Sequence, residues 1–323
     1  MIRRFSNEEG RLQNIPSSQL SAQNIVWIDL VRPSADEGTQ IERELGIEIP
    51  TRDEMEEIEI SSRLYHEDGA AFMTAILPAN ADGDDPDMQP VSFILSDSQL
   101  ITVRYHEPRA FETFLRRAEK TPMGCDTGEG VLVALLEAIV DRLADILERA
   151  GGDVDQISRQ VFRRRKGKST EARDFQSTLE TIGSKGDLTS NIRNSLVTLD
   201  RLVGFMGQRT FGHESPDGHR ERVKTLSRDV RSIADHASFL SQKITFLLDA
   251  TLGMISIEQN AIIKIFSVAA VVFLPPTLIA SIYGMNFEHM PELDWPLGYP
   301  FAIGLMILSA IMPYLFFKRR GWL

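Results

Sequence analysis

Cysteine is almost missing from this sequence, which has one, Cys125, among 323 residues. A single thiol cannot form a disulfide within the chain, and cysteine-based zinc sites need several thiolates. The sequence therefore excludes a disulfide framework and a cysteine zinc site. The first 25 residues also lack the apolar core of a secretory signal, so we expect membrane insertion to depend on segments further along the chain.

Positive charge is in short supply as well. Lys and Arg number 35 against 46 Asp and Glu, which gives a net charge of -11. Acidic runs occur at residues 53–57 and 82–87, whereas a protein that binds nucleic acid carries a basic stripe. We therefore expect no nucleic-acid partner. The acidic runs suit cations, although the simpler interpretation of any one run is a solvated acidic face.

Catalytic motifs are also missing, since no Ser/His/Asp set or metal-hydrolase pattern stands out. Residues 167–170 match the end of a phosphate-binding loop, but Phe162 stands where that loop needs its first glycine. His213 and His219 lack metal-ligand partners at helical spacing. We predict a protein without enzyme activity.

Two long apolar runs, Ala261–Ile282 and Leu297–Phe317, dominate the last part of the chain. Each has roughly the 20 residues that a helix needs to cross the hydrocarbon core of a bilayer. Trp295 and Tyr299 lie near the start of the second run, where aromatic rings favour the membrane interface. We predict a hairpin of two transmembrane helices.

Charge sets the orientation of this hairpin. Lys264 stands near the start of the first run and residues 318–320 are all basic, while the segment between the runs is acidic and has no Lys or Arg. Basic residues that flank membrane segments stay on the cytoplasmic side. We therefore expect both ends of the chain to be cytoplasmic.

The region before the hairpin has two parts. Short strand patterns at residues 25–30, 70–77, 91–95 and 99–105 predict a compact α/β domain over roughly residues 1–125. In this domain we expect a helix start at Pro33–Glu37, an acidic helix over Pro50–Ile60 with Thr51 as its cap, and a loop over residues 80–90.

Long helical patterns follow, at residues 131–162, 175–211 and 223–249. No clear stop separates the third pattern from the first apolar run, so we predict one helix from about Arg220 to Tyr283, on the order of 95 Å long. Such a helix needs neighbours, which we expect to be the two preceding helices and further copies of the chain.

Small or polar residues recur along the first apolar run at intervals that place most of them on one face of a helix. They are Ser256, Asn260, Ser267, Ala270, Thr277 and Ser281. Polar side chains within a membrane helix usually face the bundle interior or a water-filled path. The alternative is a packing face of small residues between helices.

The segment between the runs carries the most specific motif. Residues 283–288 read Tyr-Gly-Met-Asn-Phe-Glu, and residues 290–293 read Met-Pro-Glu-Leu. Placed at the end of a first span in a C-terminal hairpin, this motif resembles the signature of the CorA family of magnesium transporters. Residues 53–65, 91–103 and 298–300 extend the resemblance over most of the chain.

The resemblance implies an α+β membrane protein that forms a homopentameric funnel in the bacterial inner membrane. Its parts would be a cytoplasmic α/β domain (1–125), stalk helices (126–219), a long helix that continues into the first span (220–283), an external loop (284–296), the second span (297–317) and a basic cytoplasmic tail (318–323).

The resemblance also implies channel-like uptake of Mg²⁺, with cobalt or nickel also passing. Mg²⁺ dehydrates reluctantly, so a ring of Asn286 carboxamides beside Gly284 and Met285 would select the hydrated ion through its waters. A thioether suits Mg²⁺ poorly, so Met285 is expected to pack rather than bind. The family's pattern places Asn260, Ile263, Ala270, Leu274 and Thr277 along the pore, with Asp249 at its cytoplasmic mouth.

Feedback by cytoplasmic Mg²⁺ is the last property that the resemblance implies. Interfacial carboxylates that bind Mg²⁺ in the closed state would shift the equilibrium toward closure. The long-helix position where an aspartate is expected holds Thr225, so we predict Asp229, one turn away, together with Glu56 and Glu57.

Two alternatives stay open. One is a zinc transporter of the related ZntB type, against which Met285 speaks because the middle residue of the motif usually differs there. The other is a membrane-anchored oligomeric sensor that conducts no ion, which would have no need of a polar face on the first span.

Overall fold

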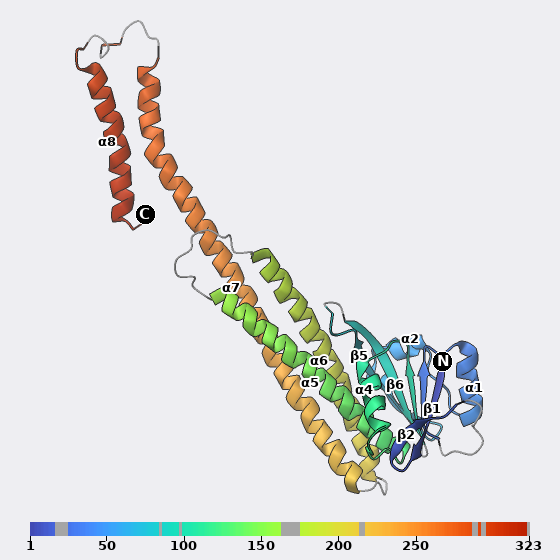
Figure 1. The fold of residues 1–323 in the computed structure, drawn as a ribbon. Coiled ribbons are helices and arrows are strands. Elements are labelled where there is room, and N and C mark those ends of the chain that lie inside the picture. The colour runs from blue at the N-terminus through green and yellow to red at the C-terminus, as the bar shows by residue number, and fades with distance from the viewer. Residues whose placement is uncertain are drawn as a thin grey trace. The chain divides into compact units, whose positions relative to one another are not determined.

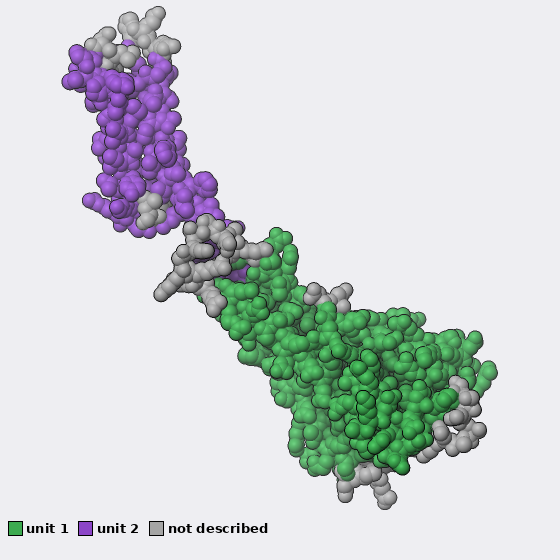
Figure 2. Space-filling view, viewed as in Figure 1, with its two compact units in different colours: residues 1–248 green, residues 249–323 purple. Residues whose placement is uncertain are grey.

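A computed structural model gives the architecture of the chain (Figure 1). It describes residues 1–16, 25–83, 86–96, 99–162, 175–212, 217–285, 290–291 and 295–321. The chain divides into two compact units, Met1–Leu248 and Asp249–Leu323, which Figure 2 shows in green and purple.

Seven strands of the described residues form one sheet in the N-terminal unit, in the order β2-β1-β3-β7-β6-β5-β4. They are β1 (Ile2–Glu8), β2 (Arg11–Asn14), β3 (Ile25–Val31), β4 (Leu64–Glu67), β5 (Ala70–Ala79), β6 (Asp87–Leu95) and β7 (Leu100–Arg104). β3 and β7 run parallel, and the other neighbours are antiparallel. The four strand predictions are confirmed to within a few residues, whereas β1, β2 and β4 were not predicted.

The expected loop over residues 80–90 is shorter than predicted. Pairing continues to Ala79 and Asp87, so Asp87, the last residue of the acidic run, belongs to β6. Backbone hydrogen bonding to β5 decides this, because strand preference depends strongly on the neighbouring strand and only weakly on the residue type alone.

Four short helices accompany the sheet: α1 (Ala35–Leu45), α2 (Arg52–Glu56), α3 (Ile60–Arg63) and α4 (Arg109–Ala118). Ser34 and Thr51 cap α1 and α2 through complete capping boxes, which confirms the predicted helix start at Pro33–Glu37 and Thr51 as a cap. The continuous helix predicted over Pro50–Ile60 is wrong. Glu57 is extended (φ -55°, ψ 140°), and acidic residues in the last turn of α2 oppose the helix dipole.

Apolar side chains fill both faces of the sheet. On one face, Ile41 of α1 and Met55 of α2 join Ile28, Leu30, Phe72 and Ile101 in one buried cluster. Trp27 packs among aromatic rings, with ring centroids 4.6 Å from Phe5 and 5.8 Å from Phe114 of α4. The sheet is therefore a buried layer, not a surface.

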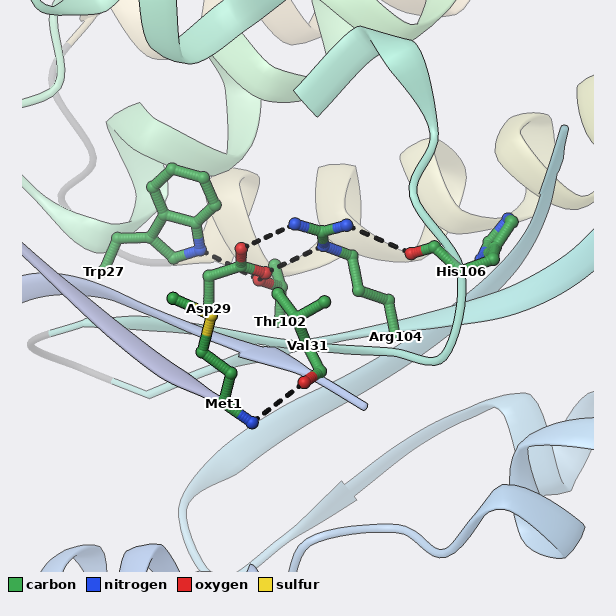
Figure 3. Close-up of polar contacts among 7 residues, drawn as sticks. All are labelled: Met1, Trp27, Asp29, Val31, Thr102, Arg104 and His106. Atoms are coloured by element: carbon green, nitrogen blue, oxygen red, sulfur yellow. Dashed lines mark hydrogen bonds and ion pairs between the residues drawn. The ribbon is translucent and has the colours of Figure 1, made fainter. Parts of the chain in front are cut away.

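A buried ion pair joins β3 to β7 (Figure 3). Arg104 Nε and Nη2 donate to the two carboxylate oxygens of Asp29 at 3.0 and 2.8 Å, and both side chains are almost fully buried. Thr102 donates to Asp29 at 2.8 Å and accepts from the Trp27 indole at 3.0 Å. Each polar group therefore has a partner, as burial of charge demands.

Three long helices complete this region: α5 (Gly128–Phe162), α6 (Phe175–Gly212) and α7 (Asp217–Tyr283). The three helical predictions are confirmed, including the continuation of the third to Tyr283. In the N-terminal unit, Arg222 of α7 donates to Glu137 of α5 at 2.7 and 2.9 Å, and Arg231 donates to Asp200 of α6 at 3.0 Å. The first part of α7 thus packs on both preceding helices.

Helix α6 also covers part of the edge of the sheet. β4 pairs only with the first four residues of β5, so the later N–H groups on that side of β5 need other partners. Ile76 N–H donates to the Thr198 hydroxyl of α6 at 3.1 Å. Covering a strand edge with a helix prevents its pairing with another chain.

Candidate functional site

The C-terminal unit consists of the last part of α7 and of α8 (Gly298–Arg319), which run beside each other (Figure 1). Both helices are long and apolar enough to cross a membrane. Their large side chains are mostly exposed, with Phe266 at 71% and Phe273 at 70%. A core helix of a soluble protein would be mostly buried, so this exposure favours a lipid or protein partner for the two helices.

In this unit, the less exposed residues of α7 form one stripe along the helix. Val268 is buried, while Lys264, Val272, Ile279 and Tyr283 are half-buried. These residues recur every four or seven positions and so share one face of the helix. On α8, Gly298 and Ala302 are the buried residues, which lets the two helices approach closely near the loop.

The residues predicted to line a pore lie together on another side of α7. Asn260, Ile263, Ala270, Leu274 and Thr277 are all exposed. At 3.6 residues per turn, they fall within a sector of about 100°, centred about 150° away from the half-buried stripe. Asp249, predicted at the cytoplasmic mouth, falls in the same sector. We call this side of the helix the α7 polar sector.

Side-chain chemistry in the polar sector suits a hydrated ion. The Thr277 hydroxyl donates to the Phe273 carbonyl oxygen at 2.8 Å, which leaves its oxygen as an acceptor. Acceptor oxygens of this kind bind the waters of a cation without a fixed charge.

The motif follows directly on the end of α7. Gly284 N–H donates to the Ala280 carbonyl oxygen at 2.9 Å, and a Cβ at Gly284 would lie 3.1 Å from that oxygen. Because φ of Gly284 is not among the positive values, close approach rather than backbone conformation favours glycine here. Met285 is 47% exposed, and Asn286 lies outside the described residues.

A cavity of about 400 Å³ lies beside the motif, between the end of α7 and the start of α8. Gly284, Tyr283, Trp295 and Tyr299 contribute to its wall. Trp295 and Tyr299 are exposed, as expected of aromatic residues at a membrane interface. Lys264, near the other end of the hairpin, donates to the Gly321 carbonyl oxygen at 3.3 Å.

The predicted regulatory residues lie in the N-terminal unit. Glu56 accepts from Arg52 Nε at 3.0 Å, and together with Glu57 it lines a shallow depression between Asp53 and Glu59. Among the described residues, no three or more His, Cys, Asp or Glu side chains are placed to hold a metal ion. The described part of one chain therefore does not build a complete regulatory site.

Asp229 belongs to a different neighbourhood from Glu56 and Glu57. Burial raises the pKa of Asp141 on α5, and the charges of Asp145, Glu137 and Asp229 raise it further. Asp229 is thus close to a row of α5 carboxylates that the sequence analysis missed. Their spacing of four residues, at 137, 141 and 145, is the signal that could have found them.

Comparisons with known proteins agree with the arrangement of the chain. A family model described as CorA-like Mg²⁺ transporter protein matches residues 22–319. The magnesium transport protein CorA of Escherichia coli strain K12 is 38% identical over 324 residues, which covers 100% of both chains. CorA of Haemophilus influenzae is 36% identical over 324 residues, also with 100% of both chains covered.

Solved structures share the fold. The complete structure of the CorA magnesium transporter from Methanocaldococcus jannaschii matches with a TM-score of 0.77 at 18% identity, covering 100% of this chain and 99% of that chain. Full-length CmaX matches with a TM-score of 0.74 at 15% identity, covering 100% of this chain and 98% of that chain. At these identities the likeness concerns the fold alone: a sheet domain, long helices and two C-terminal apolar helices. With the family model matched over residues 22–319, the chain belongs to the CorA-like Mg²⁺ transporter family, and it is a membrane transporter rather than an enzyme.

Proposed function

We propose that this chain forms a homopentameric channel that carries Mg²⁺ into the cytoplasm across the bacterial inner membrane, and that Co²⁺ and Ni²⁺ also pass. One hairpin cannot enclose a pore, so several copies must surround it. The first spans would line the pore and the second spans would lie outside them. The curated relatives of similar length, named magnesium transport proteins, support Mg²⁺ as the cargo.

The α7 polar sector is the observation that carries this proposal. Five predicted pore residues, of which Asn260 and Thr277 are polar, share one exposed side of α7 with Asp249. Polar groups inside a membrane are costly unless they face a bundle interior or water. Ile263 and Leu274 in the same sector would form apolar constrictions that close the pore by dewetting.

Selection of the ion would take place at the motif that follows α7. A ring of Asn286 carboxamide oxygens would accept hydrogen bonds from the waters of hydrated Mg²⁺. Gly284 allows the tight backbone path, and Met285 would pack because a thioether is a poor ligand for Mg²⁺. The role of Asn286 rests on the sequence motif.

The topology follows from charge. Lys318, Arg319 and Arg320 at the end of α8 would stay in the cytoplasm, which places both ends of the chain there. Residues 1–125 would then form the cytoplasmic α/β domain, 126–219 the stalk helices and 220–283 the helix that enters the membrane. Residues 284–296 would be the external loop, 297–317 the second span and 318–323 the cytoplasmic tail.

Intracellular Mg²⁺ would close the channel from the cytoplasmic side. Asp229 is exposed on α7, and Glu56 and Glu57 are exposed on the sheet domain. In a pentamer, Asp229 of one subunit would share a Mg²⁺ ion with Glu56 and Glu57 of its neighbour. Bound Mg²⁺ would relieve repulsion between these carboxylates and so favour the closed arrangement.

Mg²⁺ influx into proteoliposomes tests the proposal, with Zn²⁺ measured in parallel. The Asn286→Ala variant removes the carboxamide, and Asn194→Ala, an exposed position on α6, is the matched control. We expect influx of Mg²⁺ in the wild type and the control, loss of influx in Asn286→Ala, and much slower Zn²⁺ entry. Faster Zn²⁺ entry would indicate a zinc transporter, and no flux of either ion would indicate a sensor that does not conduct.

A further inference from the structure

A second cavity lies in the N-terminal unit, apart from the residues predicted to conduct or sense the ion. Its volume is about 530 Å³, within the usual range for small-molecule sites. Arg3 of β1, Asp82 of the β5–β6 connection, Arg109 of α4 and Arg142 of α5 contribute charged groups to its wall. We call it the arginine cavity.

Positive charge exceeds negative charge around Asp82. Arg142 and Arg149 each lie 2.6 Å from one carboxylate oxygen of Asp82, and Arg109 binds the other oxygen. Hydrogen bonding, from Arg142 above all, lowers the pKa of Asp82 to about 2. Three guanidinium groups thus share a single carboxylate, which leaves two positive charges uncompensated at this point.

The remaining charges on the wall do not remove this excess. Arg104 is also part of the wall, but its charge is balanced by Asp29. The charge of Glu112 is paired with Arg116 at 3.7 Å, and the single negative charge of Glu107 offsets the single positive charge of Arg3. Arg3 forms no salt bridge within the described part of the chain. A wall with this distribution favours an anion that carries more charge than one carboxylate.

Two further features suit a phosphate group with an organic part. Helix α4 begins beside the cavity, at Pro108 and Arg109, and no side chain caps its first turn. Uncapped N–H groups at a helix start are donors for phosphate oxygens. Phe111, Leu115 and Ile146 give the same cavity an apolar wall.

We propose that the arginine cavity binds a small phosphate-bearing anion, with the Asp82 carboxylate occupying the arginine groups when the anion is absent. Arginine suits this role because its planar fork binds phosphate oxygens in pairs. The phosphate would displace Asp82 and bring the second negative charge that the cluster lacks. This site is independent of ion conduction, which uses the C-terminal unit.

Calorimetric titration of the full-length protein in nanodiscs tests the proposal, with ADP and inorganic phosphate as probes. EDTA is present, and chloride holds the ionic strength constant, so that Mg²⁺ chelation and general screening do not contribute. We expect saturable binding of ADP to the wild type. Binding of inorganic phosphate as well would show that the phosphate alone suffices, and binding of ADP alone would show that the organic part is needed.

Three variants sharpen the test. Arg142→Gln should weaken binding about tenfold or more, the effect of one lost charge-assisted hydrogen bond. Asp82→Asn removes the competing carboxylate and should tighten binding by about the same factor. Arg231→Gln is the matched control, since Arg231 is an exposed, ion-paired arginine outside the cavity, and it should leave binding unchanged.

The proposal is wrong if neither the wild type nor Asp82→Asn binds either probe saturably. It is also wrong if the wild type and Arg142→Gln bind the probes equally well. Thermal unfolding of each variant checks that it is folded. If Arg142→Gln is unfolded, Arg3→Gln takes its place in the titration, and we expect the same loss of affinity.

Discussion

Asp29 and Arg104 face each other from two neighbouring strands and are almost completely buried. Removing either one would leave the other charge buried without its partner, which typically costs about 3–5 kcal/mol. Their segments are readily predicted as strands. Their pairing is not, because nothing local to either segment says that β3 and β7 are neighbours in the sheet.

His106 is another buried polar residue of this unit, and it predicts a pH dependence of stability. Its Nε2 donates to the Leu77 carbonyl oxygen at 2.8 Å, and Nδ1 has no partner among the described residues. Burial, with smaller contributions from the charges of Arg104 and Arg32, lowers the pKa of His106 below its ordinary value of 6.5. The Leu77 carbonyl and Asp87 act in the opposite direction but do not outweigh burial.

The unfolded chain therefore takes up a proton at His106 at a higher pH than the folded chain does. The contribution of neutral His106 to the free energy of unfolding is complete above about pH 6.5. This contribution is lost as the pH falls below that value, at up to about 1.4 kcal/mol per pH unit. We expect the Tm of the wild type to fall more steeply between about pH 6.5 and 5 than the Tm of His106→Gln.

Thermal unfolding of the full-length protein across this pH range measures the difference. Asn194→Ala, at an exposed position of α6, is the control and should give the pH dependence of the wild type. Parallel curves for the wild type and His106→Gln would show that burial of His106 does not contribute.

At the scale of secondary-structure elements, α7 shows how one helix serves two environments. In the N-terminal unit its charged residues bind α5 and α6, while in the C-terminal unit its half-buried stripe and its polar sector lie on different sides. The interruption between α2 and α3 is the contrasting case. There, like charges over residues 53–59 prevent the continuous helix that propensity predicts.

Two isoleucines of α7 form a matched pair for testing the role of the polar sector. Ile263 lies in the sector and is 60% exposed, whereas Ile265 is 67% exposed and lies roughly 160° away around the helix. We expect Ile263→Ser to hydrate an apolar constriction and raise Mg²⁺ leak severalfold under conditions that close the wild-type channel. Ile265→Ser should leave the leak unchanged.

Fluorescent Mg²⁺ indicator inside proteoliposomes measures the leak, with high Mg²⁺ on the side of the N-terminal unit. An equal rise in both variants would point to a general loosening of the helix and away from a pore that follows the sector. No rise in either variant would remove Ile263 from the pore.

At the scale of the whole molecule, the chain exposes more apolar helix surface than a soluble monomer tolerates. Lipid can cover an apolar surface but not the polar sector, which requires water or further copies of the chain. Native mass spectrometry should therefore give five chains per particle, as the proposed homopentamer requires.

Assembly also predicts how Mg²⁺ acts on the protein. If Asp229 shares an ion with Glu56 and Glu57 across subunits, Mg²⁺ should protect the full-length protein against proteolysis. We expect Asp229→Asn to raise the Mg²⁺ concentration for half-protection about tenfold or more, since one charged ligand is lost. Asp187→Asn, an exposed aspartate on α6, is the control and should behave like the wild type.

Protection that does not depend on Asp229 would move the regulatory site elsewhere. The α5 carboxylates Asp141 and Asp145 are the next candidates, because Asp229 lies close enough to influence the pKa of Asp141. The same assay on Asp141→Asn and Asp145→Asn would then identify the site.

Features that depend on local pattern can be predicted from the amino-acid sequence alone. Hydropathy and length identified both apolar helices, helical periodicity identified α5, α6 and α7, and Pro33–Glu37 and Thr51 marked two helix starts. The motif at residues 283–288 identified the family, which the match over residues 22–319 confirms.

Features that depend on neighbours distant in the chain are visible only in the folded protein. Strands β1, β2 and β4 exist because neighbouring strands supply their hydrogen bonds, and their own residues do not predict them. The Asp29–Arg104 pair and the contacts of Arg142 and Arg149 with Asp82 likewise join segments that are 60 or more residues apart. Such contacts are set by the packing of whole elements, and no local pattern carries that information.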